Sequence, residues 1–167
     1  ATYTTLQKSY RTTIEIMDLA NQLLSEMDED LPLVEPVVRH GREPEFHAMT
    51  SFEADQISQL YRDIINRGHR SVALICKTRA EAERNYTRLQ DAGMPIQLLE
   101  EQSDISADCL LIVPSHLAKG LEFDAVLIAA FDEPFRDHPI DRKLLYVAMT
   151  RPMHELHLLG QFSAVSQ

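Results

Sequence analysis

The segment Ser115-His116-Leu117-Ala118-Lys119-Gly120-Leu121-Glu122-Phe123-Asp124 lies between two apolar runs, residues 109–113 and 125–130. A glycine in a loop that follows an apolar strand lets the backbone come close to a ligand. The neighbouring Glu122 offers a carboxylate to a ribose hydroxyl. Farther along, the segment Leu145-Tyr146-Val147-Ala148-Met149-Thr150-Arg151 ends an amphipathic pattern on an arginine, and a guanidinium so placed can reach a transferring phosphate. Together the two segments predict half of a nucleotide-handling site.

The other half of such a site has no counterpart in the sequence. The 167 residues contain no Gly-x-x-x-x-Gly-Lys-Ser/Thr phosphate loop, and no acidic residue at a strand end stands out as a magnesium ligand. We therefore expect this chain to complete an ATP site whose phosphates are held by another domain.

Strand-like and helix-like patterns alternate along the chain. Apolar runs predict strands at residues 71–76, 96–99, 109–113, 125–130 and 156–159. Ser/Thr-x-x-Glu capping boxes predict three helices: 13–27 after Thr12-x-x-Glu15, one from Thr50-x-x-Glu53 to Gly68, and one from Thr78-x-x-Glu81 to near Gly93. Continuous apolar runs between amphipathic helices are typical of a mainly parallel sheet with helices on both faces. The predicted fold class is α/β.

Composition favours one intracellular domain. The chain is 44% hydrophobic, enough for one core, and both cysteines, Cys76 and Cys109, lie in apolar runs where they are expected as small buried residues. We see no membrane-length apolar segment and no signal peptide, so we expect a cytoplasmic protein. The formal net charge of -10 and the pI of about 5.1 exclude nucleic-acid binding by bulk electrostatics.

The ends and connections suggest a piece of a larger protein. The sequence begins at Ala1 without a methionine and soon enters a patterned segment, so we expect a fragment of a longer polypeptide. Residues 28–45 hold three prolines, Pro32, Pro36 and Pro44, and are predicted to form a connecting segment.

Three segments, in order, resemble the motifs of one family. Residues 6–21, beginning Leu6-Gln7-Lys8-Ser9-Tyr10-Arg11-Thr12, look like motif IV of superfamily 1 helicases of the UvrD/Rep/PcrA kind. Residues 114–124 resemble their motif V and residues 141–152 their motif VI. The particular residues in these segments are similar to those of DNA helicase IV and of HelD-like proteins. The resemblance implies that residues 1–167 form a single RecA-like domain, the second motor domain of a P-loop NTPase.

The resemblance also implies a role for particular residues. It assigns Tyr10 to adenine stacking, Arg11 and Arg151 to the γ-phosphate as catalytic groups, and Gly120 and Glu122 to ATP binding. It assigns Ser115, His116 and Lys119 to nucleic acid. The cofactor would be ATP, with Mg²⁺ held by the first motor domain of the same polypeptide, and no resident metal is expected here, since the remaining histidines show no metal-ligand spacing.

Simpler readings of the same residues remain open. Tyr10 can be a packing residue and Arg11 a solvated one, and Arg151 can serve only as a cation at a helix C-terminus. His116 is as readily a surface or core residue as a contact to a nucleic-acid strand. Two departures from the family matter: Pro114 stands where motif V usually has a threonine, which removes a hydroxyl, and Pro152 is expected to stop the helix at Arg151.

The expected function is ATP-dependent translocation. The parent protein would be a DNA helicase moving 3′ to 5′ on single-stranded DNA, and the isolated chain would be inactive because it lacks the phosphate loop. One alternative is a HelD-type factor that uses ATP to remodel RNA polymerase. The other is a degenerate protein-binding module, against which the retention of Tyr10, Arg11, Glu122 and Arg151 argues.

Overall fold

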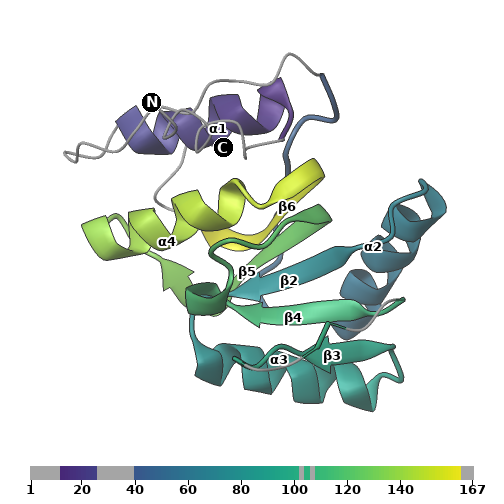
Figure 1. The fold of residues 1–167 in the computed structure, drawn as a ribbon. Coiled ribbons are helices and arrows are strands. Elements are labelled where there is room, and N and C mark those ends of the chain that lie inside the picture. The colour runs from purple at the N-terminus through teal and green to yellow at the C-terminus, as the bar shows by residue number, and fades with distance from the viewer. Residues whose placement is uncertain (1–11, 26–39, 102–103, 106–107, 163–167) are drawn as a thin grey trace.

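A six-stranded, all-parallel sheet forms the centre of the molecule (Figure 1). The computed structural model describes residues 12–25, 40–101, 104–105 and 108–162. In chain order the elements are α1 (Ile14–Ser25), β1 (Glu45–His47), α2 (Ala54–Asn66), β2 (Val72–Cys76), α3 (Arg79–Asp91), β3 (Ile96–Leu98), β4 (Leu110–Pro114), the 3₁₀ turn η2 (Ser115–Leu117), β5 (Phe123–Phe135), α4 (Pro139–Met149) and β6 (Pro152–Phe162). No described helix is long and apolar enough to cross a membrane.

The strand order is β1-β6-β5-β2-β4-β3, so β2 lies near the middle of the sheet. Val72 of β2 is level with Leu110 of β4 on one side and Ala125 of β5 on the other. All five residues of β2 are buried, as are all five of β4. Strands buried on both faces read as unbroken apolar runs, which is why the sequence predicted these two so closely.

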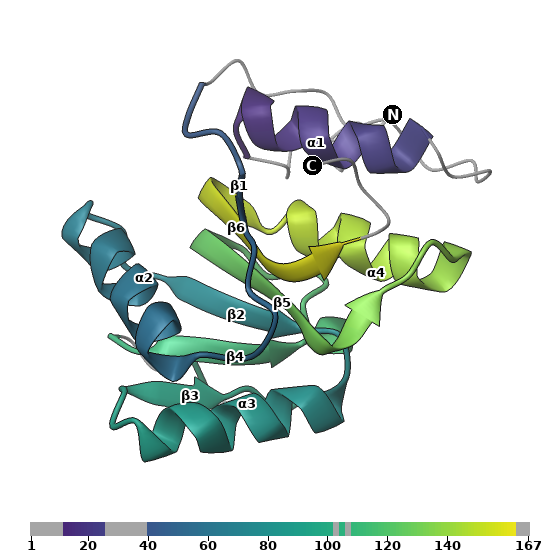
Figure 2. The ribbon, with the colours of Figure 1, turned by 180° about the vertical axis from the view of Figure 1, so that it is seen from behind.

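Helices cover both faces of the sheet (Figures 1 and 2). On one face, α1 and α4 pack against the side chains of alternate strand residues, including Ile75, Val113 and Ile128. On the other face, α2 and α3 pack against the intervening residues, including Leu74 and Ile112. The predicted α/β class, with a mainly parallel sheet between two helical layers, is therefore confirmed.

The observed helix starts agree with the predicted capping boxes only in part. Thr78 caps α3 as predicted, because its Oγ1 accepts a hydrogen bond from the Glu81 amide at 3.1 Å. The box before α1 is one residue off: the hydroxyl of Thr13, not of Thr12, accepts from the Ile16 amide at 3.3 Å. The box at residues 50–53 is wrong, since Glu53 is the N-cap of α2 and makes no side-chain cap.

Other element ends agree with prediction at two glycines and differ from it at two places. Gly68 and Gly93 follow α2 and α3 with positive φ, as expected for residues that close helices. β1 begins at Glu45, the last residue of the segment predicted to be a connection, and was not predicted as a strand. Pro152 does not stop a helix at Arg151, because α4 already ends at Met149 and Pro152 opens β6.

Candidate functional site

The connection from β4 to β5 carries the motif V residues along one face of the sheet. Because β4 and β5 both run parallel to β2, residues 115–122 must return from the carboxyl ends of the strands to their amino ends. The return uses the 3₁₀ turn η2 and a tight turn in which the Leu121 amide donates to the Ala118 carbonyl at 3.1 Å. Gly120 sits in that turn at φ +85°, and a Cβ on it would meet nothing within 4 Å. Its backbone is therefore open to approach from solvent.

Arg151 joins this loop to the end of α4. Its Nη1 donates to the Leu121 carbonyl at 3.1 Å, and its Nε donates to the Val147 carbonyl in the last turn of the helix, also at 3.1 Å. Its Nη2 lies 3.0 Å from Thr150 Oγ1, and the Phe123 amide donates to the Arg151 carbonyl at 3.0 Å. The structure thus brings Gly120, Glu122 and Arg151 to one end of the sheet.

The three residues assigned to nucleic acid are placed differently from one another. His116 and Lys119 are exposed, and neither makes a polar contact with any residue in the described part of the chain. Ser115 is buried, and its Oγ donates to the Lys77 carbonyl at 2.5 Å. Its hydroxyl thereby joins the carboxyl ends of β4 and β2, a structural role that the sequence did not suggest.

A buried ion pair fixes the start of α4 at the carboxyl end of β2. Lys77 Nζ lies 2.8 Å from Asp141 Oδ2 and also donates to the Pro134 carbonyl at 3.2 Å. The Arg136 amide donates to the same Asp141 oxygen at 2.9 Å. Burial raises the pKa of Asp141, but the Lys77 ammonium and the Arg136 amide outweigh it, so the pKa lies below its ordinary value of 3.8.

The motif IV residues cannot be compared with these positions. Tyr10 and Arg11 lie outside the described residues. The described chain resumes at Thr12, which is buried, and Thr13 then packs against Gly41. The assignments of Tyr10 and Arg11 stay predictions.

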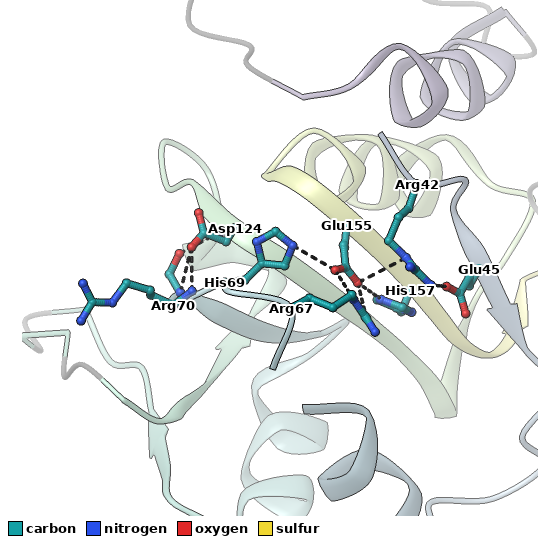
Figure 3. Close-up of polar contacts among 9 residues, drawn as sticks. Arg42, Glu45, Arg67, His69, Arg70, Asp124, Glu155 and His157 are labelled. Atoms are coloured by element: carbon teal, nitrogen blue, oxygen red, sulfur yellow. Dashed lines mark hydrogen bonds and ion pairs between the residues drawn. The ribbon is translucent and has the colours of Figure 1, made fainter. Parts of the chain in front are cut away.

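A second polar cluster, which the sequence did not reveal, surrounds Glu155 of β6 (Figure 3). Arg67 holds the buried Glu155 carboxylate through Nε and Nη2 at 2.7 and 2.6 Å. His69 Nε2 lies 3.0 Å from one of its oxygens and His157 Nε2 2.9 Å from the other. Burial raises the pKa of Glu155, but these partners dominate and hold it far below the usual range of a glutamate.

The donors and acceptors near Arg151 are compatible with one end of a nucleotide. Glu122 is exposed and has no partner among the described residues, so its carboxylate can accept from a hydroxyl. The adjoining open main chain at Gly120 and the Arg151 guanidinium suit phosphate oxygens. Asp124, in contrast, accepts from the Arg70 and Ser71 amides at 2.8 and 3.2 Å and is engaged in joining β5 to β2.

Comparisons with known proteins point to helicase C-terminal domains. Residues 110–159, from the start of β4 into β6, match the family profile of the UvrD-like helicase C-terminal domain. The crystal structure of the C-terminal domain of a possible DNA helicase from Lactobacillus plantarum WCFS1 aligns with a TM-score of 0.73 at 29% identity, covering 91% of this chain and 87% of that one. The chain has the fold of a helicase C-terminal, RecA-like domain. Gly120, Glu122 and Arg151 all lie inside the helicase-matched range.

Two other solved structures align over smaller parts. The C-terminal part of the Fun30 ATPase domain has a TM-score of 0.42 at 10% identity, covering 64% of this chain and 39% of that one. The Hef helicase domain of Pyrococcus furiosus has a TM-score of 0.41 at 14% identity, covering 65% and 26%. No curated protein sequence matches this chain significantly.

Proposed function

We propose that this chain is the second motor domain of an ATP-dependent superfamily 1 helicase or translocase that acts in the cytoplasm. Its partner would be a first motor domain of the same polypeptide, which supplies the phosphate loop and holds Mg²⁺. ATP bound between the two domains would draw them together, and hydrolysis would release them, so that cycles of closing and opening move the motor along single-stranded DNA. By resemblance the direction is 3′ to 5′.

The observation that carries the proposal is the junction between the motif V loop and the end of α4. Arg151 contacts the loop directly, through the 3.1 Å hydrogen bond to the Leu121 carbonyl, and Glu122 is the next residue. A group that senses the γ-phosphate and a group that holds the ribose would then share one short piece of main chain. Exposed His116 and Lys119, on the same connection, would face the DNA strand. One loop would thus couple nucleotide state to strand contact.

The ribose assignment can be tested at Glu122. In the polypeptide with both motor domains, Glu122→Gln should raise the KM for ATP roughly tenfold with little change in kcat, because a hydrogen bond to a charged acceptor becomes a weaker bond to a neutral one in ground state and transition state alike. Steady-state ATPase assays with ATP, 2′-deoxy-ATP and 3′-deoxy-ATP provide the readout. The wild type should discriminate against one deoxy nucleotide, and the variant should discriminate less.

Glu43→Gln is the matched control, because Glu43 is also an exposed glutamate. It makes the same charge change away from the loop and should leave both constants unchanged. If Glu122→Gln kept the wild-type preference among the three nucleotides, Glu122 would not be the ribose ligand.

The substrate can be assigned by unwinding and co-purification. Efficient, ATP-dependent unwinding of a 3′-tailed duplex, with a 5′-tailed duplex left intact, is the expected result. Weak unwinding together with retention of RNA polymerase in the absence of DNA would instead identify a transcription-remodelling factor, as in the HelD-like proteins that the motifs also resemble.

A further inference from the structure

We propose that Glu45, His47 and His157 form a binding site for a divalent transition-metal ion, with Zn²⁺ as the probe of choice. The three side chains come from two neighbouring strands, β1 and β6, at the edge of the sheet. One ligand atom of each lies within 4.8 Å of those of the other two. The site is separate from the motif V loop and does not depend on the proposed motor function.

The strand register creates the convergence. Glu45 and His47 are two residues apart on β1, so their side chains lie on the same face of the strand. Glu45 is level with His157 of the adjacent β6. His47 Nε2 is 3.1 Å from His157 Nδ1 and 3.8 Å from Glu45 Oε1. Two nitrogens bound to a tetrahedral zinc ion are about 3.3 Å apart, so the imidazoles already have nearly the required spacing.

The surroundings orient His157 as a ligand. Its Nε2 is 2.9 Å from Glu155 Oε1, and Arg67 binds that carboxylate with two hydrogen bonds. Because an ionised carboxylate can only accept, His157 Nε2 carries the proton and Nδ1 presents its lone pair towards His47. A carboxylate behind a ligating histidine is the usual support for zinc-bound imidazole.

Glu45 is oriented in a comparable way. Arg42 Nη2 binds Glu45 Oε2 at 2.9 Å, which leaves Oε1 as the oxygen on the histidine side. The side chains of Glu45 and His47 are 38% and 29% exposed, whereas that of His157 is 2% exposed, so an ion can enter from solvent and meet a rigid inner ligand.

The donor set selects the kind of ion. Two imidazoles and one carboxylate suit zinc or another first-row transition ion, whereas Mg²⁺ and Ca²⁺ prefer oxygen ligands alone. Three protein ligands leave a fourth position for water or for a group from a partner. The nearby Arg42 and Arg67 guanidiniums oppose a cation and lower its affinity, which is why affinity has to be measured and compared among variants.

A bound ion would fasten the edge of the sheet. β1 has only three residues and, within the described part of the chain, pairs with β6 alone. An ion shared between the two strands would add a cross-link that the unfolded chain cannot form, and ligands that bind only the folded state raise its stability.

The test uses the tag-free chain after treatment with a chelator. Isothermal titration with Zn²⁺ should give one ion per chain, and Co²⁺ should give the strong visible absorption of four-coordinate cobalt. His47→Gln and Glu45→Gln should each weaken Zn²⁺ binding by at least about tenfold. Zn²⁺ should raise the melting temperature of the wild type and not that of His47→Gln.

Two controls make the outcome decisive. His40→Gln removes an exposed histidine that pairs with Glu15, and His154→Gln removes another histidine of β6, one stacked on His69. Both should bind Zn²⁺ as the wild type does. His47 is partly exposed, so circular dichroism of the metal-free variant should match the wild type and exclude misfolding. Absence of Zn²⁺ binding, undiminished binding by His47→Gln, or a six-coordinate cobalt spectrum would each overturn the proposal.

Discussion

Arg151 carries the strongest functional expectation of any single side chain here. In a polypeptide that carries both proposed motor domains, Arg151→Ala should lower kcat for ATP hydrolysis on the order of 10³-fold and change ATP affinity far less, because an arginine in the proposed finger role acts on charge that develops in the transition state. Arg151→Lys should resemble the alanine variant, since an ammonium lacks the planar fork of a guanidinium. Steady-state kinetics with both variants is the measurement.

The contacts of Arg151 decide how that experiment must be interpreted. The side chain also binds the Val147 and Leu121 carbonyls, so either variant should lose roughly 1 kcal/mol of unfolding free energy whether or not Arg151 is catalytic. Stability alone therefore cannot distinguish the two roles, and kcat must be measured well below the melting temperature. Arg62→Ala, at an exposed arginine of α2, is the charge-matched control. Near-normal kcat in both Arg151 variants would leave this residue as a helix-end cation only.

At the scale of elements, β5 and β6 depend on one close approach. Gly160 of β6 has a φ of +108°, and a Cβ on it would lie 2.8 Å from the Ala130 carbonyl carbon and closer still to its oxygen. Because both atoms belong to the backbone of β5, relief requires the strands to separate. Gly160→Ala should therefore destabilise the fold by roughly 3 kcal/mol, combining a strained φ with overpacking.

Gly93→Ala separates the two causes. Gly93 also has a positive φ, +78°, but a Cβ there would meet nothing within 4 Å. Its substitution should cost only about 1 kcal/mol, the conformational part alone. Urea unfolding of both variants gives the comparison through the shift in midpoint at constant m-value. Equal losses of unfolding free energy in the two variants would mean that β5 and β6 move apart at Gly160 without an energetic penalty.

The ion pair between β2 and α4 predicts a dependence on pH. Asp141 has a pKa below its ordinary 3.8 in the folded chain, so it stabilises the fold above that value, and the contribution is lost as pH falls through the lowered folded pKa. Asp141→Asn should cost about 2 kcal/mol at pH 7, because it leaves the largely buried Lys77 without its counter-ion. The difference in unfolding free energy between variant and wild type, measured by urea unfolding, should be constant from pH 7 to 5 and shrink below about pH 4. A gap that persists unchanged to pH 2 would show that packing, not charge, is responsible.

Across the whole molecule, what could be predicted depended on whether the signal was local. β2, β4 and α3 were predictable, since a buried strand or a capped amphipathic helix leaves its own pattern in contiguous residues. β1 was not, because Glu-Phe-His is too short to show a period and becomes a strand only by pairing with β6. The first capping box was off by one because only Thr12 has a glutamate three residues later, whereas the hydroxyl that caps α1 belongs to the adjacent Thr13.

The proposed nucleotide and metal sites differ in the same respect, since only the first has a local sequence signal. Gly120, Glu122 and Arg151 could be proposed as nucleotide ligands because each lies within a contiguous motif, and the fold then brings the two motifs together. The metal cluster had no such signal, since His47 and His157 are 110 positions apart. Only the sheet register reveals that they converge. The buried role of Ser115 was equally invisible, because its partner is a main-chain carbonyl of another strand.

The net negative charge of the molecule predicts how strongly the isolated domain binds single-stranded DNA. With a net charge of -10 and few exposed cations on the motif V connection, it should neutralise only one or two phosphates. A fluorescently labelled oligonucleotide should therefore bind with a Kd weaker than about 10 µM near 150 mM salt, and the slope of log K against log salt should be about -1. Anisotropy titrations at several salt concentrations measure both quantities.

A pair of charge-removing variants shows whether that weak binding is local. Lys119→Gln should reduce the salt slope by about 0.7, the value for one lost phosphate contact on a single strand of nucleic acid. Arg62→Gln makes the same charge change at an exposed position of α2, on the opposite face of the sheet, and should leave the slope unchanged. If the two variants weaken binding equally, the binding depends on overall charge, and Lys119 does not contact the DNA strand directly. If the wild type binds below 1 µM with a shallow salt slope, the affinity comes from base stacking, and the charge argument for this domain is wrong.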